Sequence, residues 1–150
     1  MALTIQRLED GQIEAAKAII VAVCLEFFGE APVEFGDMDC IASQYREPTG
    51  TFLVLLDDRR VVGTGAIRRL DAETCELKRM WFLPAYRGKG YGTKMSEMLL
   101  EFARSAGYRR IRLDSAEMLV AAHKLYRRLG FYEIERYNAG PGTIFMERLL

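Results

Sequence analysis

The sequence has few of the residues that build metal centres and disulfide frameworks. Its 150 residues include one histidine and only three cysteines, Cys24, Cys40 and Cys75, which are far apart and form no Cys-x-x-Cys pair. An odd number of scattered cysteines is not a disulfide framework, and a single histidine excludes a histidine-based metal cluster. We therefore expect no bound metal and a reducing compartment, the cytoplasm.

The sequence also lacks a surplus of charge and any long hydrophobic run. Its 21 basic residues balance its 21 acidic residues, whereas a protein that holds nucleic acid or anionic lipid needs excess positive charge. No apolar run approaches the roughly 18 residues of a membrane span, and the first residues contain no apolar signal-peptide segment. We expect a soluble protein that has neither nucleic acid nor a membrane as a partner.

Apolar residues are abundant enough to build a core. Hydrophobic residues make up 50% of the sequence and aromatic residues 11%, which excludes intrinsic disorder. A chain of this length is the size of one ordinary domain. We therefore predict a single domain over residues 1–150.

The hydrophobic pattern predicts alternating groups of strands and helices. Two apolar segments on either side of the polar turn Asp57–Arg60 are typical of an antiparallel hairpin, and one later helix joins two strands as a parallel crossover. This mixture indicates the α/β class in the α+β sense. The predicted helices cover residues 12–28, 39–45, 91–106 and 120–129, and the predicted strands cover residues 3–7, 51–56, 61–70, 75–83, 109–114, 131–137 and 143–150.

The segment with the strongest chemical signal runs from Glu76 to Gly92. It is a predicted strand that leads into a glycine-rich turn at the start of a predicted helix. The first turn of a helix has backbone N–H groups without internal partners, and the helix dipole makes that end positive. Glycine lets a phosphate approach the backbone closely, and Arg87 and Lys89 add positive charge. The sequence therefore predicts a phosphate site at this turn.

Two common phosphate-binding motifs do not fit the turn. The P-loop fails because Gly90, rather than serine or threonine, follows Lys89, and the Gly-x-Gly-x-x-Gly motif of dinucleotide sites fails because it needs a glycine where Thr93 stands. The spacing that fits is Arg-x-x-Gly-x-Gly, formed by Arg87, Gly90 and Gly92.

In this spacing and context the chain resembles the GNAT superfamily of N-acetyltransferases, in which such a turn holds the pyrophosphate of acetyl-CoA. A second block of that family is a strand followed by a helix that contributes a tyrosine and ends in Gly-Phe. The matching residues here are the strand Ile111–Ser115, then Tyr126, then Gly130 and Phe131. The resemblance implies the GNAT fold, a mixed and mostly antiparallel central sheet flanked by helices.

The resemblance also implies which residues bind acetyl-CoA. The pantetheine arm would lie along the strand before the turn, with the Met80 N–H near the acetyl carbonyl. The strands 76–83 and 109–115 would separate to admit this arm. The implied binding residues are Met80, Trp81, Phe82, Arg87, Gly88, Lys89, Gly90, Tyr91 and Gly92.

Two further residues match the catalytic positions of the family. Glu76 matches the general base of many members, although a strand carboxylate is more commonly a surface group paired here with Lys78 or Arg79. Tyr126 matches the tyrosine that protonates the departing thiolate, although a tyrosine on an apolar helix face is more commonly a core residue. His123 is expected on a helix surface. Covalent transfer through a Cys75–His123 pair is a weaker alternative.

The resemblance implies transfer of the acetyl group of acetyl-CoA to a primary amine, directly in a ternary complex. The rival interpretation is a non-catalytic CoA-binding or regulatory module. The acceptor side would be built by residues 27–45 and 137–143, whose acidic residues would suit a cationic small-molecule amine. The oligomeric state stays open between a monomer and a homodimer. The acidic residues in question are Glu30, Glu34, Asp37 and Asp39.

Overall fold

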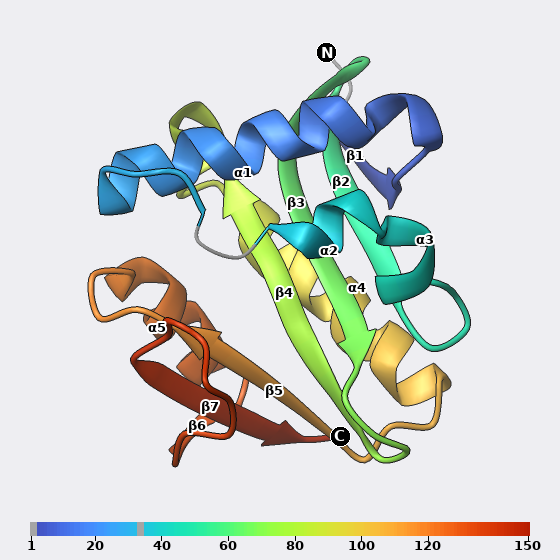
Figure 1. Cartoon of the computed structure of the whole chain (residues 1–150), viewed down its shortest axis with the longest axis vertical. Helices are drawn as coiled ribbons and strands as arrows, with labels where there is room; N and C mark the ends of the chain where they lie inside the picture. Colours follow the sequence, from blue (N-terminus) through green and yellow to red (C-terminus); the bar gives the residue numbers. More distant parts are fainter. Residues whose placement is uncertain (1–2, 33–34) are drawn as a thin grey trace.

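The computed structural model describes residues 3–32 and 35–150, which form a twisted sheet with helices on both faces (Figure 1). The sheet has seven strands in the order β1-β2-β3-β4-β5-β7-β6. All neighbouring strands are antiparallel except β4 and β5, which α4 connects as a parallel crossover. The strands are β1 (Leu3–Arg7), β2 (Thr51–Asp57), β3 (Arg60–Arg69), β4 (Thr74–Phe82), β5 (Arg110–Ser115), β6 (Tyr132–Ile134) and β7 (Ile144–Leu149).

The helices divide the apolar core into two parts, one on each face of the sheet. Helix α1 crosses the near face in Figure 1 and α4 lies behind the sheet. Strand β2 contributes to both parts because its side chains alternate, with Val54 packing on the α1 side and Leu55 on the α4 side. The helices are α1 (Ile13–Phe28), α2 (Gly36–Asp39), α3 (Ile41–Gln44), α4 (Tyr91–Ser105) and α5 (Val120–Arg128).

Strands β4 and β5 pair over three residues and then separate. The parallel register ends at Glu76, opposite Arg112, although β4 continues to Phe82 and β5 to Ser115. A bulge in β4 follows, at which Arg79 has a φ of 56°, a left-handed conformation that is uncommon outside glycine. The divergence is visible in Figure 1. The predicted separation of these two strands is therefore confirmed.

The predicted fold class is confirmed, but two predicted elements were wrong in extent. The helix expected over residues 39–45 is instead the last residue of α2 followed by α3, because Cys40 leaves the helical conformation between them. The strand expected over residues 131–137 is only β6. Residues beyond β6 form a loop instead, since the Arg136 guanidinium donates hydrogen bonds to the carbonyls of Asn138, Gly140 and Gly142.

All three cysteines are free, as the sequence predicts; Cys24 and Cys75 are buried and Cys40 is exposed. Across the described ranges, no helix combines the length and hydrophobicity that crossing a membrane requires.

Candidate active site

A cleft of about 1030 Å³ occupies the region where β4 and β5 separate. Its walls come from the end of α1, from β4, from the turn before α4 and from α5. Most of the residues predicted from the sequence lie along it. Those that line the cleft are Met80, Trp81, Phe82, Arg87, Gly88, Gly90, Gly92 and Tyr126, whereas Glu76, Lys89 and Tyr91 do not.

The glycine-rich turn at one end of the cleft has the geometry of an anion cradle. Gly88 and Gly90 have φ angles of 70° and 89°, a left-handed conformation that glycine adopts without steric cost. Gly90 is the N-cap of α4, so the first N–H groups of a 15-residue helix point out of this turn. A Cβ atom built at Gly88 or Gly90 meets no atom within 4 Å, which leaves the backbone open to a ligand. Lys89 is exposed beside it, and Tyr91 packs against the core.

Replacing Gly90 with valine should raise the KM for acetyl-CoA about tenfold or more, because the new side chain strains the turn and blocks phosphate approach. The KM for S-acetylpantetheine, which has no phosphate, should change little. Gly107 is a matched control, since it has a φ of 91° and equally open surroundings at the opposite end of α4. If Gly107→Val and Gly90→Val had the same effect on both substrates, the turn would not be a phosphate cradle.

The Arg87 guanidinium lines the cleft but is already held by a carboxylate of α1. Its Nε donates to the Phe82 carbonyl at 2.9 Å, and its two Nη atoms donate to the Glu26 carboxylate at 2.6 and 2.8 Å. It also lies over the Phe27 ring, 5.0 Å from the centroid. The hydrogen bond from Arg87 lowers the pKa of Glu26. No pattern in the sequence points to Glu26, which stands 61 positions from Arg87.

Replacing Glu26 with glutamine should lower the KM for acetyl-CoA about two- to fivefold, because the carboxylate competes with the phosphates for the same guanidinium. The gain should shrink as salt is added, since both groups are near solvent. Glu14→Gln, which removes the same charge from the other end of α1, is the control. A higher KM in Glu26→Gln would instead mean that Glu26 holds Arg87 in its binding position.

The β4 bulge opens the backbone around Met80. Met80 has no partner in the register with β3, where Ala66 pairs with Lys78 and Thr64 with Trp81. It also lies beyond the last pair with β5. The buried Thr64 hydroxyl fixes the bulge by donating to the Arg79 carbonyl at 2.6 Å. The middle of β4 is therefore shaped to expose backbone polar groups along the cleft.

Glu76 is buried completely, with 0% of its surface exposed, and lies behind the cleft wall. Its carboxylate accepts hydrogen bonds from Arg68 Nε at 2.8 Å and from the Tyr137 hydroxyl at 2.5 Å. The Lys78 ammonium is 4.0 Å away. The alternative of a surface carboxylate is therefore wrong in its exposure, because the sheet, Arg68 and Tyr137 enclose Glu76, although its expected ion pair with Lys78 is present.

Tyr126 lies on the inner face of α5, where it both packs in the core and lines the cleft. It is 6% exposed, and its ring is 5.7 Å from that of Phe131 in a tilted contact. Burial raises the pKa of its hydroxyl, which therefore keeps its proton at neutral pH. Within the described part of the chain this hydroxyl makes no hydrogen bond. It is thus a proton donor that has no acceptor among residues 3–32 and 35–150.

The structure does not bring Cys75 and His123 together. Cys75 Sγ is 3.8 Å from the Arg110 carbonyl, and burial raises the pKa of this thiol to about 12, the opposite of an activated nucleophile. His123 Nε2 is 3.0 Å from the Ser115 hydroxyl. The prediction of a surface histidine was wrong: His123 is 5% exposed because it is on the face of α5 that packs toward β5.

Two of the acidic residues predicted on the acceptor side are already paired with basic side chains. Asp37 accepts hydrogen bonds from Arg79, with a 3.0 Å contact to Nε, and from the Tyr45 hydroxyl. Burial raises the pKa of the Asp37 carboxyl, but these hydrogen bonds outweigh it and the net pKa is lowered. Asp39 pairs with Lys17 at 2.7 Å. Glu30 and Asp37 both line the cleft, and Glu34 lies outside the described residues.

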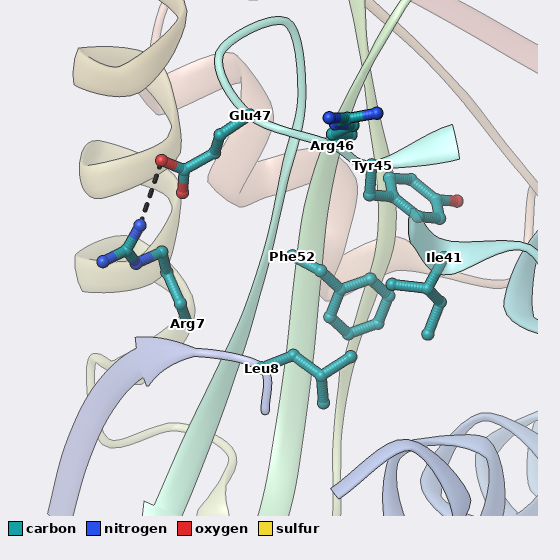
Figure 2. A pocket seen from close by; sticks show the side chains of 7 residues that line it. All are labelled: Arg7, Leu8, Ile41, Tyr45, Arg46, Glu47 and Phe52. Atoms are coloured by element: carbon teal, nitrogen blue, oxygen red, sulfur yellow. Dashed lines mark hydrogen bonds and ion pairs between the residues drawn. The ribbon is translucent and has the colours of Figure 1, made fainter. Parts of the chain in front are cut away.

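A second, smaller hollow of about 250 Å³ lies near the ends of β1 and α3 (Figure 2). Leu8, Ile41 and Phe52 form its apolar floor, and an ion pair of 3.1 Å joins Arg7 and Glu47 at its rim. It contains no catalytic arrangement of side chains. Within residues 3–32 and 35–150, no group of three or more histidine, cysteine or acidic side chains could hold a metal ion.

Comparison with known proteins agrees with this geometry. The sequence model of the Acetyltransferase (GNAT) family matches residues 19–131. The uncharacterized N-acetyltransferase YjgM of Escherichia coli is 37% identical over 102 residues, 66% of this chain and 61% of that protein. Human N-acetylaspartate synthetase is 40% identical over 97 residues, 63% of this chain but 32% of that protein. The chain therefore spans less than two thirds of the length of these relatives.

The fold agrees equally well with a solved structure. A GNAT-family acetyltransferase from Staphylococcus aureus Mu50 superimposes with a TM-score of 0.90 at 21% identity, and the match covers 99% of both chains. The likeness extends over the whole sheet and all the elements that surround the cleft.

Proposed function

Because the chain belongs to the acetyltransferase (GNAT) family, we propose that it transfers the acetyl group of acetyl-CoA to the primary amine of a small molecule. One observation carries the proposal. A single cleft runs from the glycine-rich turn before α4, past the bulge at Met80, to Tyr126, and Glu76 lies directly behind its wall. Different parts of this cleft can therefore bind the phosphates, the thioester and the acceptor.

Glu76, Met80 and Tyr126 each have a separate role in the proposed reaction. Glu76 takes the proton that the acceptor ammonium must lose, through an intervening water because the carboxylate does not line the cleft. The amine nitrogen then attacks the thioester carbon, and the Met80 N–H donates to the developing oxyanion. When the carbon–sulfur bond breaks, Tyr126 gives its proton to the thiolate, and the second proton of the attacking nitrogen restores the phenol. The products are a neutral amide and the free CoA thiol, and the proton taken by Glu76 is released to solvent. The burial of Cys75 supports direct transfer in a ternary complex over an acetyl-cysteine intermediate.

The test is release of free CoA thiol from acetyl-CoA in the presence of a panel of amines. The panel should include aspartate, because the name of the N-acetylaspartate synthetases identifies that acceptor for those relatives. Acetyl-CoA binding without thiol release for any amine would favour the rival, a non-catalytic CoA-binding module. The presence of Tyr126 in the lining of the cleft and of Glu76 behind that lining supports the enzyme. The three free cysteines support a reducing, cytoplasmic setting.

A further inference from the structure

We propose that the acceptor amine carries a carboxylate and that Lys78 selects for it, an inference that rests on the proposed acetyl transfer. Lys78 is on β4, two residues beyond the last β4–β5 pair at Glu76, and lines the cleft. The glycine-rich turn follows the opposite end of β4. Lys78 is therefore placed to meet the acceptor, not the phosphates of acetyl-CoA.

Three cationic side chains line this end of the cleft, but two of them are already held by carboxylates. Arg68 Nε donates to Glu76 at 2.8 Å, and Arg79 Nε donates to Asp37 at 3.0 Å. Charge-assisted hydrogen bonds of this kind fix the orientation of a guanidinium. These two arginines therefore form part of the wall.

Lys78 is held differently. Its ammonium nitrogen is 4.0 Å from a Glu76 oxygen and 4.0 Å from an Asp114 oxygen, beyond the roughly 3.2 Å limit of ordinary N–H···O hydrogen bonds. The side chain is only 17% exposed. Among the described residues none accepts a hydrogen bond from its three N–H donors. Lys78 therefore lines the cleft with N–H donors that its two ion-pair partners do not engage in hydrogen bonds, and a carboxylate on the acceptor would provide acceptor oxygens for them.

The same geometry orients the acceptor amine. A carboxylate bound to Lys78 lies next to Glu76, because the Lys78 ammonium is 4.0 Å from that residue, and the Glu76 charge is already paired with Arg68. In a small amino acid the amine is close to its carboxylate, so it would be held on the side of the cleft that the proposed base serves. An acceptor that carries a second cation instead would face the repulsion of Lys78.

The experiment compares matched pairs of amines that differ only in a carboxylate and the corresponding neutral amide. Suitable pairs are L-aspartate with L-asparagine, L-glutamate with L-glutamine, and glycine with glycinamide. Wild-type kcat/KM should favour the carboxylate of at least one pair about 10- to 100-fold, the usual effect of a hydrogen bond to a charged group. Lys78→Gln should reduce that ratio to near one, mainly through the acceptor KM, whereas Lys78→Arg should keep most of it.

Controls separate this inference from the proposed function. Arg59→Gln removes the same charge from the turn between β2 and β3 and should leave the ratio unchanged. The melting temperature and the KM for acetyl-CoA should be similar in all variants. If none of the amines supported thiol release, the proposed function would be overturned and this inference with it. Activity on amines without a carboxylate preference, or a preference that survives in Lys78→Gln, would overturn only the role of Lys78.

Discussion

Replacing Glu76 with glutamine is expected to lower kcat by about 10²- to 10⁴-fold, the usual contribution of a general base. The acceptor arrives mainly as an ammonium ion, since an alkyl amine has a pKa of about 10.4. Loss of the base should therefore matter most at low pH and less as the pH approaches the pKa of the amine. The measurement is kcat against pH. The KM for acetyl-CoA should hardly change, because Glu76 lies behind the cleft wall.

The burial of Glu76 requires a control for stability. Glu76→Gln breaks the ion pair with Arg68, which costs about 3–5 kcal/mol for a fully buried pair and less here because the Arg68 side chain is 29% exposed. Tyr137→Phe also removes a hydrogen bond to this carboxylate but leaves the base in place. Tyr137→Phe should lower the melting temperature, but its loss of kcat should be much smaller than that of Glu76→Gln. A wild-type pH–rate profile in Glu76→Gln would make Glu76 a structural carboxylate that holds Arg68 and Tyr137.

The parts of the site that could be predicted from the sequence are those encoded by neighbouring residues. The turn before α4 depends on local backbone conformation, and two of its glycines do have positive φ angles. The hydrophobic pattern was sufficient for α4 because its apolar face extends over 15 residues. In α5 the same reasoning placed His123 on the wrong side, since nine residues give too few turns to define a face.

The residues that sequence reasoning missed are those brought together by distant pairing. Arg68 stands opposite Glu76 in the β3–β4 register, so only an exact hairpin register could have predicted their contact. Tyr137 reaches Glu76 from a loop 61 positions away, and the Arg136 hydrogen bonds that shape this loop leave no periodic signal in the sequence. Glu26 and Arg87 are equally distant. Such contacts form only when the chain has folded, and they determine which charged side chains at the cleft are already paired.

Replacing Tyr126 with phenylalanine should lower kcat about 10²-fold or more, since the variant loses the proposed general acid. The leaving group is a thiolate whose conjugate acid has a pKa of about 8.5, by analogy with cysteine. The Tyr126 hydroxyl holds its proton at neutral pH, because burial raises its pKa, and so can donate to that developing charge.

The substitution should cost little stability, because the ring keeps its contact with Phe131 and the hydroxyl has no acceptor among the described residues to lose. The matched control is Tyr108→Phe. The Tyr108 hydroxyl donates to the Thr49 carbonyl at 2.6 Å, and neither residue lines the cleft. That variant should lose stability and keep its kcat, whereas Tyr126→Phe should do the reverse and still bind acetyl-CoA normally. The measurements are kcat, the melting temperature and the dissociation constant of acetyl-CoA for each variant. An unchanged kcat in a stable Tyr126→Phe protein would make Tyr126 a core residue and show that the thiolate leaves without its help.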